Sequence, residues 1–414
     1  MNFQIPPSQY QRFQITFGAL CSTIFDLDSG KAFHMNASAT RLLKKFISKT
    51  DTAQLPKDLY QELLKIDFLK KNGSINDELT SEGQLPSRPL KKVWIELTNR
   101  CNQKCVHCYA SASPQSSDGL DTKMIFQFLE NIFSLGCETV QFTGGEPLLR
   151  DDLVLFCDLA RQNQVKEIEI FSNLSSSKRK LLDKLVNSNV IISTTVLAPD
   201  AETHDRLTRT PGSFDRMLSN IKYLQSLGVS INASIILMAE TETRYDQITK
   251  FCDSIGVHYG DPDPVRPFGR GKNEHIRCRQ FQNIKYKPFF ETTSRSFLYA
   301  MNFNPCWGHM LFLRYDGKVV PCPHARNFVL GDVRKDSFIE ILKTASLQAW
   351  SITLDKVEIC RECEFRYLCS DCRPLAFEEN TAKLMKKNYR CLYDPYTGKW
   401  QNLIPKSSRK EVFI

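Results

Sequence analysis

Cysteine thiols are the residues of this chain with the clearest capacity for chemistry, and three of them stand close together. Cys101, Cys105 and Cys108 are separated by three and two residues. Thiolates at this spacing can each bind one iron of a cubic iron–sulfur cluster, which leaves the fourth iron without a protein ligand. Because an iron with an open position can bind a substrate or cofactor, the spacing favours a catalytic site over a structural one.

Zinc is the alternative metal for these thiols, but a closed tetrahedral zinc site needs a fourth ligand nearby. A second motif, Gly144-Gly145-Glu146-Pro147, follows a predicted strand at residues 139–142. Its glycines allow the backbone to approach a ligand closely, and Glu146 offers an anionic acceptor.

The cysteine and Gly-Gly-Glu-Pro motifs together resemble those of radical S-adenosylmethionine (radical SAM) enzymes. The resemblance implies a [4Fe-4S] cluster on the three thiols that binds S-adenosyl-L-methionine and cleaves it reductively. It further implies that Gly144, Gly145 and Glu146 contact the amino group of the SAM methionine. No residue stands out from the sequence as the catalytic acid or base.

Two further segments resemble parts of these enzymes that are expected to contact SAM. Ser172 and Asn173 end a strand where relatives have a Ser/Thr-Asn-Gly turn, although Leu174 replaces the glycine. They are expected to contact the ribose or carboxylate of SAM. The stretch His204-Asp205-Arg206-Leu207-Thr208-Arg209 matches a family pattern and implies that Arg209 pairs with the SAM carboxylate. A surface arginine is the alternative for this residue.

The last hundred residues hold a second group of cysteines: Cys306, Cys322, Cys360, Cys363, Cys369, Cys372 and Cys391. A zinc ribbon is the alternative, but its cysteine pairs normally lie roughly 12–20 residues apart. The order resembles the SPASM extension of radical SAM enzymes, which carries auxiliary iron–sulfur clusters.

The SPASM resemblance implies two auxiliary clusters with different ligand sets. Cys360, Cys363, Cys369 and Cys391 are expected to hold one cluster, and Cys306, Cys322 and Cys372 the other. The second cluster lacks a fourth cysteine, so it is expected to have an open iron, or a ligand such as His309 or His324. An open iron suits a substrate thiolate. The five scattered cysteines are interpreted as buried, inert thiols; they are Cys21, Cys137, Cys157, Cys252 and Cys278.

Strand and helix patterns alternate through the middle of the chain, which predicts an α/β fold with a partial parallel (β/α) barrel of radical SAM type. The expected domains are residues 1–80, a linker at 81–92, the barrel at 93–290 and a loop-rich iron–sulfur domain at 291–414. In such barrels the active site lies just after the strands. The three-cysteine motif and the Gly-Gly-Glu-Pro motif are both found in that position.

The N-terminal 80 residues predict a β-hairpin, at 21–27 and 31–35, followed by helices near 37–46 and 56–66. This order favours a winged helix-turn-helix domain, and it resembles the leader-peptide recognition element of enzymes that modify ribosomally made peptides. DNA binding is the alternative, but the second helix carries acidic residues that match phosphate poorly.

Composition adds limits on partners and location. The 414 residues carry a formal net charge of +9, yet no nucleic-acid-reading motif accompanies it, and no apolar run is long enough to span a membrane. No secretory signal is visible, so we expect a cytoplasmic protein with neither nucleic-acid nor membrane partners. Fifteen cysteines in a reducing cytosol favour metal binding over disulfides.

The resulting prediction is a radical SAM oxidoreductase that modifies a ribosomal precursor peptide with a leader, using a 5′-deoxyadenosyl radical. A thioether crosslink is the expected product, and a flavodoxin or ferredoxin the expected electron donor. Carbon–carbon crosslinking or oxidation of another protein, as in sulfatase maturation, are the alternatives within the family. A metal-stabilised DNA-binding regulator is the alternative outside it.

Overall fold

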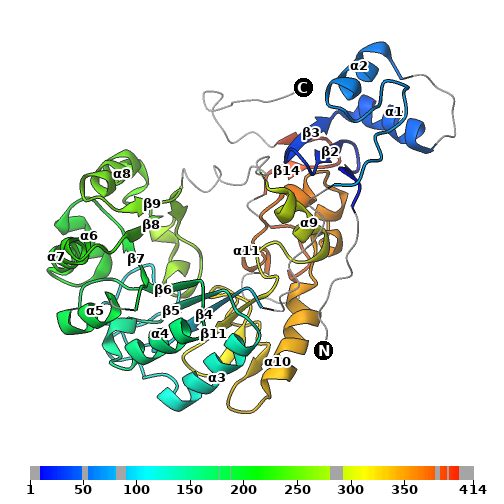
Figure 1. Ribbon diagram of the computed structural model, residues 1–414. Helices are drawn as coiled ribbons and strands as arrows, with labels where there is room; N and C mark the ends of the chain where they lie inside the picture. The colour runs from blue at the N-terminus through cyan, green and yellow to red at the C-terminus, as the bar shows by residue number, and fades with distance from the viewer. Residues whose placement is uncertain are drawn as a thin grey trace. The chain divides into compact units, whose positions relative to one another are not determined.

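The computed structural model describes residues 10–48, 55–80, 90–176, 178–186, 188–279, 292–377, 383–388 and 391–400. The chain divides into two compact units, each assembled from segments far apart in sequence (Figure 1). Unit 1 comprises Met1–Ser87, Asn283–Gly308 and Trp350–Ile414, and unit 2 comprises Arg88–Gln282 and His309–Ala349.

A curved, mainly parallel sheet forms the centre of unit 2. Its parallel strands are β4 (Lys92–Glu96), β5 (Thr139–Thr143), β6 (Glu167–Phe171), β7 (Ile191–Val196) and β8 (Ile231–Leu237), each paired with the next. Two short strands, β9 (His258–Tyr259) and β10 (Asp263–Pro264), both pair with β8 in parallel. Along β8, alternate residues are buried, because successive side chains of a strand point to opposite faces.

Helices connect the strands of unit 2 and line one side of the sheet (Figure 1). They are α3 (Thr122–Ser134), α4 (Leu153–Gln162), α5 (Arg179–Val186), α6 (Ala201–Thr208), α7 (Ser213–Ser226) and α8 (Tyr245–Ser254). Short 3₁₀ turns η1 (Pro147–Leu149), η2 (Glu242–Arg244), η3 (Gly269–Lys272) and η4 (Glu274–Ile276) complete the connections. Asp121 and Asp200 fix the starts of α3 and α6, because their carboxylates accept first-turn backbone N–H groups.

The first part of the cysteine-rich region extends this same sheet. β11 (Met310–Leu313) pairs with β4 in parallel, and β12 (Lys318–Val320) and β13 (Gly331–Asp332) follow antiparallel, before α10 (Phe338–Ala345). Among the described residues the sheet therefore runs from β10 at one edge to β13 at the other, and these two strands do not pair with each other. The predicted α/β class and partial parallel barrel are confirmed.

The N-terminal part of unit 1 is a three-stranded antiparallel sheet followed by two helices. β1 (Phe13–Phe17), β2 (Ser22–Asp26) and β3 (Lys31–Met35) pair in sequence order, and α1 (Ala37–Ser48) and α2 (Lys57–Lys65) follow. The predicted hairpin and helices correspond to β2, β3, α1 and α2, whereas β1 has no counterpart among the expected elements. The assignment of a winged helix-turn-helix to this arrangement stays a prediction.

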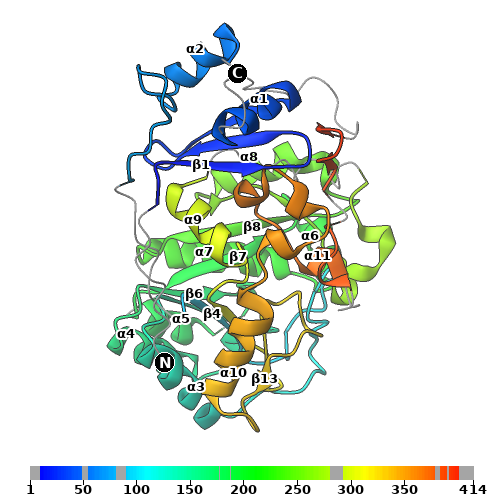
Figure 2. The same ribbon diagram turned by 90° about the vertical axis from the view of Figure 1, so that its right-hand side faces the viewer.

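Two apolar clusters hold unit 1 together. The first lies within the N-terminal segment, where Ile24, Leu43, Leu63 and Phe68 are almost fully buried. The second joins the N-terminal sheet to the end of the chain: Phe25 and Leu27 pack with Phe297, Leu298, Phe365, Leu368 and Tyr393. Figure 2 shows the blue N-terminal strands beside α9 (Ser294–Asn302) and the orange C-terminal turns.

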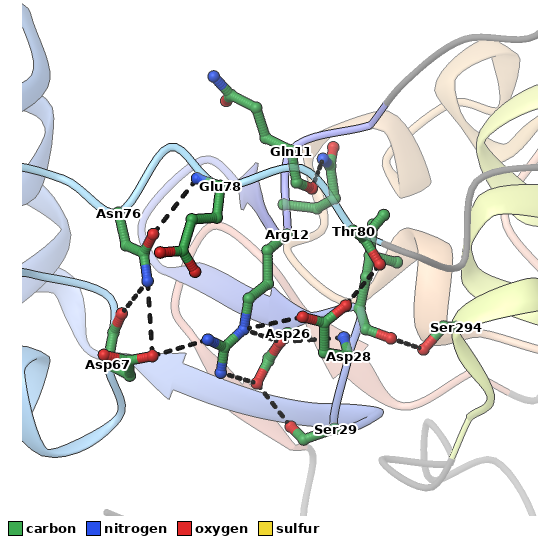
Figure 3. Close-up of polar contacts among 12 residues, drawn as sticks. Gln11, Arg12, Asp26, Asp28, Ser29, Asp67, Asn76, Glu78, Thr80 and Ser294 are labelled. Atoms are coloured by element: carbon green, nitrogen blue, oxygen red, sulfur yellow. Dashed lines mark hydrogen bonds and ion pairs between the residues drawn. The ribbon is translucent and has the colours of Figure 1, made fainter.

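Arg12 links the strands of the N-terminal sheet to the segment after α2 (Figure 3). Its guanidinium donates to both carboxylate oxygens of Asp26, at 2.9 and 3.0 Å, and to Asp67 at 2.6 Å. Burial alone raises the pKa of Asp26, but hydrogen bonds from Arg12 and Ser29 outweigh it and bring that pKa below its usual value. The hydroxyl of Ser294 donates to the carbonyl of Leu27, again joining the two ends of unit 1.

The remaining elements of unit 1 are short. They are η7 (Leu354–Lys356), η8 (Cys360–Glu362), η9 (Arg366–Leu368), α11 (Pro374–Phe377), β14 (Tyr393–Asp394) and β15 (Lys399–Trp400), after the π-helical turn η6 (Ser346–Trp350). No helix in the described part of the chain is both long and apolar enough to cross a bilayer. Most of the predicted linker, residues 81–89, and the predicted boundary at 290/291 lie outside the described residues.

Candidate iron–sulfur and SAM site

The three thiols predicted to bind the first cluster lie on the loop that follows β4. Each is free of any disulfide, and Cys101, Cys105 and Cys108 are close enough to affect one another electrostatically. Burial, followed by repulsion from Cys108, raises the pKa of Cys105 to about 12. Three grouped thiolates in a buried loop need a cation to stabilise them, and the iron of a cluster supplies it. The residues present therefore fit a [4Fe-4S] cluster.

Gly144 and Gly145 lie directly against the start of this cluster loop. A Cβ atom at Gly145 would lie 2.1 Å from the Arg100 carbonyl oxygen, and one at Gly144 would lie 2.4 Å from the Thr98 carbonyl oxygen. The Gly145 N–H donates to Thr98 at 2.7 Å, and the Glu146 N–H donates to Arg100 at 2.9 Å. The glycines are thus required because the end of β5 touches the backbone that leads into Cys101.

Glu146 is fully buried and holds the ends of β5 and β6 together. Its Oε1 accepts hydrogen bonds from the Ser172 hydroxyl at 2.7 Å and the Leu148 N–H at 3.0 Å, while Oε2 accepts from the Asn173 N–H at 2.9 Å. Burial raises the pKa of Glu146 to about 7, against the opposing effect of these hydrogen bonds. Both carboxylate oxygens are engaged within the protein. The predicted contact of Glu146 with SAM stays a prediction.

Asn173 connects this carboxylate to the cluster loop. Its side-chain amide donates to Asn102 Oδ1 at 2.8 Å and contacts Cys101 Sγ at 3.6 Å. Leu174 adopts a φ of 52°, the left-handed conformation that the glycine of relatives would adopt freely. Ser172 is directed to Glu146, and its predicted SAM contact remains untested.

The end of α6 is hydrogen-bonded to the backbone of the cluster loop. Lys104 and Val106 donate their backbone N–H groups to the carbonyls of Thr208 and Leu207, at 3.1 and 2.9 Å. The next residue, Arg209, ends the helix in the left-handed conformation, with a φ of 53°. Asp205 accepts hydrogen bonds from the start of α7, so this acidic residue of the motif has a structural role.

Arg270 is a residue of the cluster loop's surroundings that the sequence analysis did not single out. Its Nε donates to the carbonyl of Cys105 at 2.7 Å, its Nη2 donates to that of Ala112 at 2.8 Å, and its backbone N–H donates to Cys108 at 3.0 Å. A Cβ at the neighbouring Gly269 would lie 2.4 Å from the Cys108 carbonyl oxygen. The signal that the sequence offers for it is the Arg-Pro-Phe-Gly-Arg segment at residues 266–270, which closely follows β10.

The segment around Cys322 is tied to the same region of unit 2. Arg326 donates to both carboxylate oxygens of Glu96, at 2.5 and 3.0 Å, and its guanidinium lies 5.8 Å from the centre of the Tyr109 ring. His324 lies beside the rings of Tyr109 and Phe268, with centroids 5.6 and 4.9 Å away. The chain that follows Cys322 thus contacts the residue after Cys108.

Four of the C-terminal cysteines come together in unit 1. Cys360, Cys363, Cys369 and Cys391 affect one another electrostatically, as expected for ligands of one cluster. Burial, followed by the Asp371 charge, raises the pKa of Cys360 to about 12. These thiols, none of which forms a disulfide, fit an auxiliary iron–sulfur cluster.

The remaining predicted ligands are distributed over both units. Cys306 and Cys372 belong to unit 1, and Cys322 belongs to unit 2. The two histidines considered as alternative ligands, His309 and His324, also belong to unit 2. Burial lowers the pKa of His309 to about 4, so its imidazole is neutral at pH 7. The ligand set of this second auxiliary cluster stays a prediction.

Comparison with protein families identifies two regions of the chain. Residues 95–252 match the radical SAM superfamily, and residues 306–364 match the SPASM iron–sulfur cluster-binding domain. The first match includes the three thiols of the cluster loop and Glu146, and the second includes Cys306, Cys322, Cys360 and Cys363. These matches support a SAM-binding [4Fe-4S] cluster and auxiliary clusters as the cofactors.

Curated relatives have several activities. The chain is 22% identical over 313 residues to the antilisterial bacteriocin subtilosin biosynthesis protein AlbA of Bacillus subtilis, covering 71% of this chain and 69% of that protein. It is 25% identical over 343 residues to an AdoMet-dependent heme synthase of Methanosarcina barkeri, covering 72% of this chain and 95% of that protein. A probable GTP 3',8-cyclase of Methanocaldococcus jannaschii is 22% identical, covering 62% and 89%.

Solved structures share the fold. Streptococcus suis SuiB bound to the precursor peptide SuiA has a TM-score of 0.57 at 12% identity, covering 93% of this chain and 99% of that chain. A structure of anSMEcpe with bound AdoMet has a TM-score of 0.54 at 15% identity, covering 75% of this chain and 92% of that chain.

Proposed function

We propose that this chain, which carries a radical SAM domain followed by a SPASM iron–sulfur domain, modifies a ribosomally made precursor peptide and forms a thioether crosslink in it. The observation that carries the proposal is the extent of the structural likeness to SuiB. This likeness covers 93% of this chain, and the SuiB structure contains its precursor peptide. The sequence similarity to AlbA, a bacteriocin biosynthesis protein, supports the same substrate class.

The N-terminal sheet offers a site for the leader of such a peptide. Among the described residues β3 pairs only with β2, so its other edge presents backbone N–H and C=O groups that an extended peptide can pair with. Addition of a strand to a sheet edge uses backbone hydrogen bonds and demands little specific sequence. The three-stranded sheet with β3 at its edge therefore supports leader binding.

The chain's own residues organise the radical centre. Cys101, Cys105 and Cys108 would hold a [4Fe-4S] cluster that, when bound, supplies the electron for reductive cleavage of SAM to a 5′-deoxyadenosyl radical. Arg270 brings a positive charge to the loop that holds these thiolates, and it fixes the loop through two backbone carbonyls. Asn173 directs its amide donor toward Cys101.

A thioether joins a peptide sulfur to a carbon atom, and the product is lighter by two hydrogen atoms. One hydrogen atom leaves the carbon and ends in 5′-deoxyadenosine, while the thiol proton goes to solvent and one electron must leave. The predicted auxiliary clusters, when bound, would accept that electron. A thiolate is a suitable ligand for an iron with an open position, which favours a cysteine of the peptide as the sulfur donor. Flavodoxin or ferredoxin is the proposed donor of the initiating electron.

The test is an anaerobic reaction of the reconstituted chain with dithionite, SAM and any short precursor peptide found encoded beside its gene. We expect 5′-deoxyadenosine together with a peptide that has lost two hydrogen atoms and one alkylatable thiol. The Cys105→Ala variant should give neither product. A crosslinked peptide that keeps every thiol alkylatable would instead favour carbon–carbon bond formation, and 5′-deoxyadenosine without any peptide change would reject a peptide as the substrate.

Metal analysis separates this proposal from the metal-stabilised DNA-binding alternative. Roughly ten or more irons per chain, with matching sulfide, are expected for the enzyme, whereas about two zincs with no visible absorbance would indicate the regulator.

A further inference from the structure

Three side chains with metal-binding atoms meet in unit 1, apart from the cysteines assigned to clusters. They are Cys21, just before β2, His34 in β3, and Glu364, between η8 and η9. One potential ligand atom from each lies within 4.8 Å of the other two. Two of these residues come from the N-terminal sheet and the third follows the cluster cysteine Cys363, so they join segments more than three hundred residues apart in sequence.

Glu364 is the central residue of this group, and its carboxylate is incompletely satisfied. The side chain has no exposed surface. One oxygen, Oε1, lies 3.1 Å from His34 Nε2 and accepts a hydrogen bond from the hydroxyl of Tyr393. The other oxygen, Oε2, is buried without a hydrogen-bond partner in the described structure. A buried carboxylate oxygen without a partner costs free energy, and a cation beside it would remove that cost.

The backbone around the group is shaped to admit these side chains. A Cβ at Gly18 would lie 2.8 Å from Glu364 Oε2, and one at Gly398 would lie 3.2 Å from Cys21 Sγ. The Ala19 N–H donates to the Glu362 carbonyl at 2.8 Å, and Arg366 donates to the Phe17 carbonyl at 2.9 Å. The turn between β1 and β2 is therefore fixed against the loop of the auxiliary cluster.

His34 is also held in position. Its ring stacks on that of Phe365 with centroids 5.1 Å apart, while its Nε2 faces the carboxylate. Tyr393 packs against the same Phe365 ring and directs its hydroxyl to Glu364. The three donors thus converge without a rearrangement of the backbone, and Tyr393 supplies the kind of second hydrogen bond that orients a metal-binding carboxylate.

We propose that Cys21, His34 and Glu364 bind a divalent zinc ion that fastens the N-terminal sheet to the auxiliary-cluster loop. One sulfur, one imidazole nitrogen and one carboxylate oxygen form a donor set that suits zinc and is unsuited to magnesium or calcium, which prefer oxygen ligands alone. A water molecule completes the tetrahedron. The site is separate from the cysteines assigned to the iron–sulfur clusters, and Cys21 then has a function that its interpretation as an inert thiol did not include.

The test uses the full-length chain, reconstituted anaerobically with iron and sulfide, incubated with zinc sulfate and desalted. Elemental analysis and zinc-edge X-ray absorption report the amount of zinc and its ligands, whatever the iron content. We expect about one zinc per chain bound by one sulfur, at about 2.3 Å, and by nitrogen and oxygen ligands. Cys21→Ser and His34→Gln should each lower the zinc content several-fold and leave the iron content unchanged.

The matched control is Cys157→Ser, which alters a fully buried thiol of unit 2 and should retain the zinc. Added zinc should also raise the melting temperature of the wild-type chain but not that of His34→Gln, a readout available even if Cys21→Ser folds poorly. The proposal is overturned if the wild-type chain retains no zinc. It is equally overturned if both variants bind as much zinc as the wild type, or if the zinc is bound by sulfur alone, as in a cluster site filled by the wrong metal.

Discussion

Replacement of Gly145 by alanine should disrupt the cluster loop through a steric clash alone. Gly145 is not among the glycines with positive φ, so alanine suits its backbone conformation, but the added Cβ would lie 2.1 Å from the Arg100 carbonyl oxygen and 2.6 Å from its carbon. Ordinary contact begins at 3.4 Å, so the two segments must separate by about 1.3 Å. Both sides are backbone, and no flexible side chain can give way.

The cost of such overpacking is about 3 kcal/mol, at the upper end of the usual range, because neither segment can relax by changing a rotamer. For a unit of this size that corresponds to a fall in melting temperature of roughly 6–12 °C. The loop that must move leads directly into Cys101, so the variant should also lose roughly the four irons of one cubic cluster after anaerobic reconstitution. 5′-Deoxyadenosine formation should fall below detection.

The matched control is Gly260→Ala. Gly260 has no positive φ, and a Cβ there meets nothing within 4 Å, so this variant should keep the melting temperature and iron content of the wild type. The steric reasoning is refuted if Gly145→Ala retains its full iron content and melts at the same temperature as Gly260→Ala.

Three other predictions concern the same unit. Glu96→Gln removes the buried counter-ion of the partly buried Arg326 and should lower the free energy of unfolding by up to about 3 kcal/mol, measured by chemical denaturation. Arg270→Ala should weaken iron retention by the first cluster while the auxiliary clusters remain, which iron analysis and electron paramagnetic resonance can distinguish. Burial raises the pKa of Glu146 from 4.5 to about 7, so between these values the folded chain holds a proton that the unfolded chain has released. The free energy of unfolding should therefore fall as the pH rises through this window, by up to roughly 3 kcal/mol, and Glu146→Gln should remove that slope in denaturation curves.

Local patterns in the sequence were sufficient for the parallel sheet and for the loop that carries the three thiols. Alternation of apolar runs and amphipathic segments predicted the parallel sheet, and the strand expected at residues 139–142 is observed as β5 at Thr139–Thr143. The glycines of the Gly-Gly-Glu-Pro motif were predicted to allow the backbone to approach a ligand closely. The structure shows them against the carbonyls of Thr98 and Arg100, and their contact with a ligand stays a prediction.

Contacts between segments far apart in sequence could not be predicted from these patterns. Arg270 binds the Cys105 carbonyl across 165 positions, and β11 adds to β4 although it is too short to show a clear strand pattern. Cys21 looked like an isolated thiol because His34 and Glu364 reach it only through the pairing of β2 with β3 and the packing of unit 1. Such arrangements depend on tertiary structure, for which a single sequence gives no local signal.

The construction of unit 1 from both ends of the chain has a consequence for protein synthesis. Leu27 and its partner Ser294 are 267 positions apart, so at a few to twenty residues per second the ribosome needs on the order of tens of seconds to supply the second after the first. During this interval the apolar surface of Phe25 and Leu27 lacks its partners Phe297, Phe365 and Tyr393. Expression of residues 10–80 alone exposes the same surface permanently. A fragment made for peptide-binding studies therefore needs polar replacements at these two positions, or the C-terminal segment supplied alongside it.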